Sequence, residues 1–205
     1  MNPDRAFFGN EIWIVFEKLV YIVEDRGALL EIIRKCCHKD SKSEELLYKQ
    51  FFGYALSIAL AYCIDREDAL EVVHDGFIKI FSNISQYDPS KSFRSWLRAI
   101  IVNTAIDQVR KEKKEEFLKI PDSLQVPDDK GNAISDLTAS EMMKVIHHLP
   151  MNERTVFLLY ETEGFSHEEI ANKLNVTSSS SRVYLARAKK RLREMFPVFF
   201  DIQHG

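Results

Sequence analysis

The sequence is poor in the residues that interrupt helices. The 205 residues include only seven glycines and six prolines, which are too few for the many turns of a β structure. No alternating strand pattern bounded by hairpin turns occurs, and helix formers fill most of the chain. We therefore expect an all-α protein.

Cysteine is scarce as well. Cys36, Cys37 and Cys63 follow no paired spacing, which excludes a disulfide framework and indicates reduced thiols in a cytoplasm. The run Cys36-Cys37-His38 is not a convincing zinc site, because adjacent cysteines rarely chelate one metal and no second pair exists. We expect neither a metal nor a cofactor.

The chain also lacks an uninterrupted apolar run. Residues 1–28 are apolar but carry charges at Glu11, Glu17, Lys18, Glu24 and Asp25, which excludes a transmembrane helix of about 20 apolar residues. No apolar segment is followed by a small-residue cleavage site, so we expect no secretory signal and no membrane insertion. An extra amphipathic helix and a start codon called too far upstream both remain compatible with this segment.

A large net charge is missing too, since the formal value is −3. The charge is segregated instead: residues 115–141 hold seven acids against Lys119 and Lys130, whereas the residues before the C-terminus are strongly basic. Such segregation fits a DNA-binding protein whose remaining surface meets a protein partner or repels non-specific DNA.

Two helix signatures lie close together between Gly164 and Leu192. Ser166 with Glu169 forms a capping box, and Asn175 can adopt the left-handed conformation that ends a helix. Thr177 or Ser178 then caps a second helix. The inward face of that helix is expected to carry four residues at helical spacing, Ser181, Leu185, Ala188 and Leu192.

The opposite face of the second helix is basic. A short helix, a tight turn and a longer basic helix form the helix-turn-helix arrangement, whose second helix enters the DNA major groove. Because the caps, the turn length and the one-sided charge agree, we favour DNA binding over an ordinary solvated face. The cations expected on this face are Arg182, Arg187, Lys189, Lys190, Arg191 and Arg193.

The rest of the chain divides into helical segments and a linker. Helices are expected within 29–114, one of them capped at its start near Ser43, another opening at Asp65 and another beginning near Phe93. The acidic residues 115–136, with two prolines and a turn-forming run, are typical of a flexible linker. Residues 137–196 would form a four-helix unit ending in the helix-turn-helix, and 197–205 a tail.

No catalytic constellation is present in the sequence. His147 and His148 lack a carboxylate at ligand spacing, and His167 stands in the first turn of a helix, where solvent exposure is the default. The sequence contains no glycine-rich phosphate loop and no nucleophile motif. We expect a non-enzyme without a small-molecule substrate.

Four stretches resemble the bacterial sigma-70 family of RNA polymerase initiation factors, and above all its extracytoplasmic-function group. They lie in family order and spacing within 29–196: DREDALEVVHDGFIKIF (65–81), YDPSKSFRSWLRAIIVNTAIDQVRK (87–111), LPMNERTVFLLYETEGFSHEEIA (149–171) and NVTSSSSRVYLARAKKRL (175–192). The resemblance implies a cytoplasmic sigma factor that binds core RNA polymerase, selects promoter DNA and helps to open the −10 element. It also implies inhibition by an anti-sigma factor.

The resemblance also implies roles for individual residues. The polymerase-binding face would consist of Asp68, Glu71, His74, Asp75 and Lys79. Contacts to the −10 region would come from Tyr87, Asp88, Ser90, Lys91, Asn103, Asp107, Arg110 and Lys111. Contacts to the −35 element would come from Ser178, Ser179, Ser180, Arg182, Val183, Ala186, Arg187 and Lys190.

Three aromatic residues of the 87–111 stretch could stack on a separated strand. For Phe93 and Trp96 their helical spacing favours core packing, whereas for Tyr87 the two interpretations are balanced. At two positions the sequence departs from the family pattern. Ser181 stands where an apolar residue is usual, which weakens packing, and Tyr184 stands where a basic one is usual, which alters the −35 sequence read.

Two other functions compete with this interpretation. An ordinary helix-turn-helix regulator would carry an unrelated ligand-binding or dimerisation module at its N-terminus. Such a module would not need the proline-containing loop that separates an acidic helix from a basic one within residues 65–111, so this loop favours a sigma factor. An adaptor protein would leave the basic face of 178–193 unexplained.

Overall fold

In the computed structural model, residues 26–112 and 145–195 are described, and they form helices and connecting turns without a strand. The chain divides into two compact units; the division falls at Val109 and Arg110, in the last turn of the final helix of the first unit, and that helix is described whole with the first unit. The all-α class with two helical units is confirmed. The expected linker at 115–136, the tail at 197–205 and residues 1–25 lie outside the described part.

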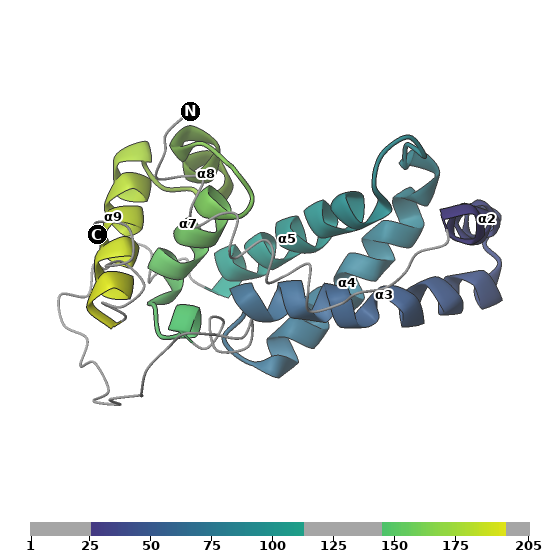
Figure 1. Ribbon diagram of the computed structural model, residues 1–205, viewed down its shortest axis with the longest axis horizontal. Helices are drawn as coiled ribbons and strands as arrows, with labels where there is room; N and C mark the ends of the chain where they lie inside the picture. Colours follow the sequence, from purple (N-terminus) through teal and green to yellow (C-terminus); the bar gives the residue numbers. More distant parts are fainter. Residues whose placement is uncertain (1–25, 113–144, 196–205) are drawn as a thin grey trace, which may run out of the picture. The chain divides into compact units, whose positions relative to one another are not determined.

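The first unit contains α2 (Arg26–Cys36), α3 (Ser41–Tyr62), α4 (Arg66–Asn83), the 3₁₀ turn η1 (Ile84–Gln86) and α5 (Phe93–Glu112). Figure 1 shows the long helices α3, α4 and α5, the short α2 next to α3, and a loop leading from α4 to α5. Helix α3 packs against both α2 and α4. This unit corresponds to the helices expected within 29–114, except that α2 begins at Arg26, three residues before that range.

Side chains cap the long helices of this unit. The Asp40 carboxylate accepts hydrogen bonds from Ser43 N at 2.9 Å and Ser43 Oγ at 2.6 Å, so Asp40 caps α3. Helix α3 therefore begins at Ser41, two residues before Ser43, and its capping residue is Asp40, since Ser43 is the donor to that cap and is buried in the first turn. Asp65 caps α4 as expected, accepting from Glu67 N and Asp68 N at 2.9 Å.

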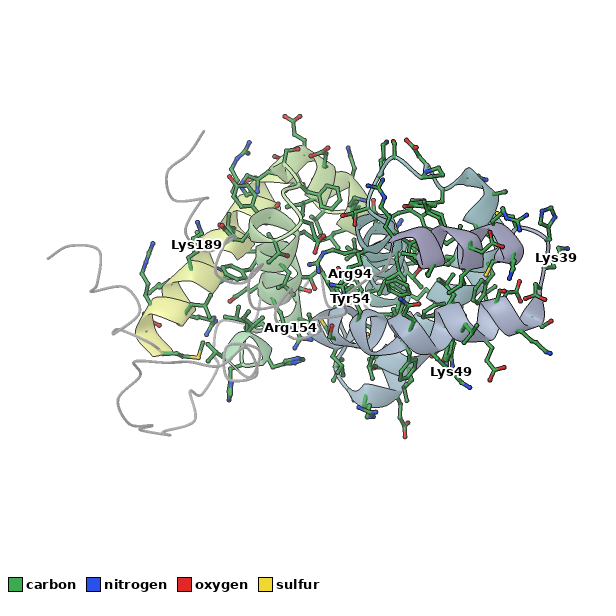
Figure 2. All side chains as sticks on the ribbon, turned by 45° about the vertical axis from the view of Figure 1, so that its right-hand side comes forward. Lys39, Lys49, Tyr54, Arg94, Arg154 and Lys189 are labelled. Atoms are coloured by element: carbon green, nitrogen blue, oxygen red, sulfur yellow. The ribbon has the colours of Figure 1, made fainter. Side chains whose placement is uncertain are left out.

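The core of the first unit is apolar and partly aromatic. The Phe51 and Phe93 rings lie 5.0 Å apart between their centroids, joining α3 to α5, and the Arg94 guanidinium lies 5.2 Å from the Tyr54 ring centroid (Figure 2). The side chains buried between these helices include Leu47, Ile58, Val73, Phe77, Ile80, Leu97 and Ile101.

The second unit contains α7 (Met151–Glu161), α8 (His167–Leu174) and α9 (Ser178–Met195). Helix α9 packs against both α7 and α8. Residues 145–147 are helical, so part of a further helix precedes α7; the residues of the expected unit 137–196 before residue 145 lie outside the described part. The inward stripe expected on α9 is confirmed, since Ser181, Leu185, Ala188 and Leu192 are all buried.

Among the described residues, no helix combines the length and the apolar character that a membrane span requires.

Candidate nucleic-acid interface

The turn between α8 and α9 is built as the sequence predicts. Ser166 Oγ accepts from Glu169 N at 3.2 Å, and Ser166 N donates to Glu169 Oε2 at 2.7 Å, which completes the capping box. Asn175 is left-handed, with φ 56°, and ends α8. Thr177, one of the two expected caps for α9, accepts from Ser180 N at 3.0 Å through Oγ1. Local side chains thus set both ends of the turn.

The outward side of α9 presents the residues expected to read the −35 element. Arg182, Ala186 and Lys190 are exposed, and Val183 is 42% exposed although it is apolar. Arg187 is half-buried, as are Ser178 and Ser180, whereas Ser179 is exposed. The eight residues therefore occupy the start and one side of a single helix, which is the geometry needed for groove contacts.

Two cations expected on this face turn inward instead. Lys189 Nζ forms an ion pair with Glu161 Oε1 at 2.8 Å, and Arg191 Nε donates to Glu153 Oε2 at 2.8 Å. Figure 2 labels Lys189 on α9. Both acids belong to α7, on which α9 packs. The prediction that all six cations of α9 share the open face is wrong for these two, because buried carboxylates of the neighbouring helix attract them.

The two departures from the family pattern are both buried. Tyr184 is 6% exposed, burial raises the pKa of its phenol, and its hydroxyl is hydrogen-bonded to the Asn152 side chain. Tyr184 packs against α7 and does not lie on the outward side of α9. Its location therefore does not support the expectation that it alters the −35 sequence read. Ser181 is 0% exposed, and its Oγ lies 2.9 Å from His167 Nδ1. The expected solvent exposure of His167 is also wrong, because its side chain is half-buried against α9.

The loop before α5 is organised around Tyr87. Tyr87 is 8% exposed, its hydroxyl donates to Lys91 O at 2.6 Å, and its ring contacts Phe93 and Trp96 at centroid distances of 5.3 and 5.6 Å. Core packing of Phe93 is confirmed, and Trp96 is half-buried. The ring of Tyr87 is therefore a support for the loop and not an exposed stacking surface, which corrects the stacking alternative for this residue.

Three polar residues of the same loop are exposed. Asp88, Ser90 and Lys91 all reach solvent, and Asp88 Oδ1 accepts from Ser90 N at 2.9 Å. This backbone hydrogen bond is the main cause of the lowered pKa of Asp88. Arg26 of α2 donates to Pro89 O at 3.0 Å, which ties the loop to the start of the unit. The buried ring of Tyr87 and the ordered backbone of the loop thus support a small polar surface, which is formed by Asp88, Ser90 and Lys91.

Helix α5 carries the other residues expected to contact the −10 region. Asn103, Asp107, Arg110 and Lys111 are exposed at spacings that place them along one side of the helix. Asp107 lies 3.4 Å from Lys79 Nζ of α4, which also donates to Thr104 Oγ1 at 3.1 Å. One lysine thereby links the helix expected to bind polymerase with the helix expected to lie along DNA.

The expected polymerase-binding face lies on α4. Glu71, His74, Asp75 and Lys79 are exposed and Asp68 is half-buried. The sequence reasoning missed Ile78, which is 64% exposed beside them. Its signal was available, because Ile78 stands four residues after His74 and outside the buried stripe of Val73, Phe77 and Ile80. The His74 ring also stacks at 6.5 Å on Tyr48 of α3, which the sequence could not indicate.

These features define a class: an all-helical protein that carries a DNA-reading helix-turn-helix in one unit and a capped, partly charged helix bundle in the other. A family model for Sigma-70 region 2 matches residues 47–115, and one for Sigma-70, region 4 matches residues 139–192. Together the two matches cover more than half of the chain, in the order that the family requires. The chain belongs to the sigma-70 family, in its extracytoplasmic-function group, and is a transcription initiation factor.

Two relatives that are ECF sigma factors agree with this assignment. The ECF RNA polymerase sigma-E factor of Haemophilus influenzae is 28% identical over 173 residues, which cover 76% of this chain and 89% of the relative. The ECF RNA polymerase sigma factor SigM of Bacillus subtilis is 26% identical, with 73% and 93% covered. A solved structure of the sigma factor RpoE with the anti-sigma factor NepR, from Bartonella quintana, is 23% identical, covers 78% of this chain and 98% of that one, and has a TM-score of 0.43.

The region 2 match also decides between the functions considered above. An ordinary regulator would have an unrelated ligand-binding or dimerisation module at the position of residues 47–115, which instead match a sigma-factor domain. The same match argues against a general adaptor protein, because it assigns these residues to a sigma-factor domain.

Proposed function

We propose that this sigma factor divides its work among three surfaces: the exposed side of α4 binds core RNA polymerase, the loop before α5 and α5 itself contact the −10 region, and the outward side of α9 reads the −35 element. The observation that carries the proposal is the orientation of α9. Its inner side is held by a buried stripe and by two ion pairs to α7, so Arg182, Val183, Ala186 and Lys190 are left on the outer side.

The chemistry of α9 fits duplex reading. An arginine in the major groove donates two hydrogen bonds to guanine O6 and N7, and Arg182 is exposed in the first turns of the helix, where such contacts are made. Ser178, Ser179 and Ser180 stand at the N-terminus, where hydroxyls and backbone N–H groups bind phosphate. Lys190, more than two turns further on, would contact the phosphate backbone.

The chemistry of the loop fits a single-stranded base. A base taken out of the stack must be received by polar groups, and unstacking costs about a few kcal/mol. Asp88, Ser90 and Lys91 offer an acceptor, a hydroxyl and a cation on an ordered turn. Because Tyr87 is buried beneath them, its contribution is to hold this turn in place. Arg110 and Lys111 would then follow the phosphates along α5, with Asn103 and Asp107 on the same side.

The chemistry of α4 fits a protein partner. Glu71, His74, Asp75 and Lys79 surround the exposed Ile78, so a charged rim encloses an apolar centre. Asp68 extends the rim toward the start of the helix. Core polymerase is the partner that a sigma factor requires, and an anti-sigma factor would inhibit by covering the same side of α4. The protein would act in the cytoplasm, where both polymerase and promoters are found, and without catalysis of its own.

In vitro transcription tests this proposal. Core RNA polymerase is mixed with a promoter library, with and without the protein, and transcripts are sequenced to extract the −10 and −35 preferences. We expect promoter-dependent transcripts only when the protein is present. Failure to form a complex with core polymerase, or transcripts without sequence preference, would contradict the proposal.

A further inference from the structure

Three helices of the second unit meet at His167. Its Nδ1 lies 2.9 Å from Ser181 Oγ on α9, and its ring stacks on Tyr160 of α7 with centroids 4.6 Å apart and planes 23° from parallel. His167 itself is the first residue of α8. A single side chain therefore connects the helix before the motif, the first helix of the motif and the helix that carries the DNA-reading residues.

The hydrogen bond between His167 and Ser181 is the means by which a polar residue is accommodated in this core. Ser181 is 0% exposed, among apolar residues of the same inward stripe. A buried hydroxyl without a partner is costly, so Ser181 requires an acceptor or a donor at this place. The imidazole supplies it in either tautomer, because a serine hydroxyl can both donate and accept.

This bond differs in kind from the apolar contacts around it. Apolar burial itself is non-directional, so the directed contacts of α9, which are this hydrogen bond and the two ion pairs to α7, add an angular restraint to side-chain packing. A hydrogen bond restricts both distance and angle. A rotation of α9 by about 10° would move an atom about 9 Å from the helix axis by about 1.5 Å. That displacement is enough to break a hydrogen bond to a base edge.

Ser181 directly precedes Arg182 in α9, so the restraint acts next to the first base-reading residue. We propose that the His167–Ser181 hydrogen bond positions α9 about its own axis and thereby determines how sharply the protein discriminates −35 sequences. His167 and Ser181 are positioning residues that do not touch DNA. The inference rests on the proposed role of α9 in −35 recognition.

Four variants of the full-length protein separate the hydrogen bond from the ring contact. Ser181→Ala removes the hydroxyl. His167→Phe keeps an aromatic ring against Tyr160 but has no nitrogen, whereas His167→Asn places an amide atom where Nδ1 lies and loses the ring. The double variant Ser181→Ala with His167→Phe tests whether both residues act through one bond. Thr162→Val is the matched control, since it removes a hydroxyl of the same unit that donates to Leu158 O at 2.6 Å and does not involve α9.

The quantity measured is the ratio of affinities of the reconstituted holoenzyme for a promoter with the selected −35 element and for the same promoter with that element scrambled. We expect Ser181→Ala and His167→Phe each to lower this ratio about fivefold, the equilibrium equivalent of one ordinary hydrogen bond. The double variant should lose no more than either single variant. His167→Asn and Thr162→Val should retain the wild-type ratio, and affinity for the scrambled promoter should be unchanged throughout.

Several results would overturn the inference. An unchanged ratio in Ser181→Ala or His167→Phe would do so, even if thermal melting showed either variant to be less stable, since the pair would then be structural only. A ratio in His167→Asn as low as in His167→Phe would show that restoring a hydrogen-bonding atom does not restore discrimination, so the hydrogen bond would not be its cause. If the wild-type holoenzyme itself did not discriminate between the two promoters, the proposed role of α9 would fail instead, so the two failures are distinguishable.

Discussion

At the scale of single residues, neighbouring cations of α9 have different roles. Lys189 is 17% exposed at its side chain and is paired with Glu161, whose side chain is 0% exposed, whereas the side chain of Lys190 is 75% exposed. A charge can be buried only if it is paired, and breaking such a pair leaves the other charge uncompensated. Lys189 therefore holds α9 on α7, whereas Lys190 reaches solvent and forms only an exposed ion pair with Glu194 at 3.7 Å.

This difference predicts unequal effects on stability. Lys189→Ala should lower the free energy of unfolding by about 3 kcal/mol, because it leaves Glu161 in a buried site without its cation. Lys190→Ala, the matched control one residue away, should change it by less than about 0.5 kcal/mol. Urea denaturation followed by circular dichroism measures both values. Similar losses in the two variants would contradict the assignment of Lys189.

The second ion pair predicts a pH dependence. Burial raises the pKa of Glu153 above its usual value, and the attraction of Arg191 offsets this shift only in part. A carboxyl group whose pKa is higher in the folded than in the unfolded protein binds its proton more tightly when folded. Its contribution to stability is therefore fully present below the unfolded pKa and is lost as pH rises through the folded pKa.

Glu153→Gln removes this titration. The free energy of unfolding of the wild type minus that of the variant should fall as pH rises from about 4 to about 7, since only the wild type acquires a desolvated charge. Urea denaturation at a series of pH values gives this difference directly. A difference that stayed constant or increased with pH would show that attraction to Arg191 outweighs the cost of burial.

At the scale of helices, two glycines have different structural roles. A Cβ at Gly53 of α3 would meet no atom within 4 Å, whereas a Cβ at Gly76 of α4 would lie under 3 Å from Ile101 Cδ1 of α5. Gly53 is exposed and Gly76 is buried. Gly76 thus permits the close approach of α4 and α5, while Gly53 only adds freedom to the unfolded chain.

We expect opposite outcomes when each glycine is replaced by alanine. Gly53→Ala should stabilise the protein by about 0.5–1 kcal/mol through the lower backbone entropy of the unfolded state. Gly76→Ala gains the same term but must displace Ile101 in a packed core, at a cost of about 1–3 kcal/mol, so it should be destabilising. Thermal denaturation of the two variants is a sufficient measurement. An equal gain in both would mean that Ile101 moves aside freely.

At the scale of the whole molecule, the proposed surfaces belong to units with separate cores, so the two binding activities should be separable by mutation. Asp75→Arg should reduce the association with core polymerase, because it reverses a charge on the exposed side of α4, and should leave the affinity for duplex −35 DNA unchanged. Equilibrium binding to core polymerase and to labelled duplex measures the two affinities. Unchanged core binding would contradict the assignment of α4.

Arg182→Ala should do the opposite: it should weaken binding to −35 DNA and leave the association with core polymerase unchanged. Loss of a base-reading arginine should cost about 1–3 kcal/mol at one −35 position and relax the preference there. Lys190→Ala should instead weaken binding to every sequence and reduce the slope of log K against log salt by about one. A uniform loss for Arg182→Ala on all templates would show that it contacts only phosphate.

The sequence by itself determined the helical class, the order of the two units and the caps of α4 and α8. Ser166, Glu169, Asp65 and Asn175 behave as expected, because caps depend on atoms only a few residues apart. The family motifs likewise depend on spacing along the chain. These features need no knowledge of what lies across the core.

Only the tertiary structure decided which way several polar side chains face. Lys189, Arg191, Tyr184 and His167 occupy positions that local patterns treat as exposed or basic, yet each is held by a residue of another helix. Periodicity defines the sides of a helix but not the charges that a neighbouring helix presents to them. Long-range pairing of this kind arises from folding, and it leaves Arg182 and Lys190 on the outward side of α9.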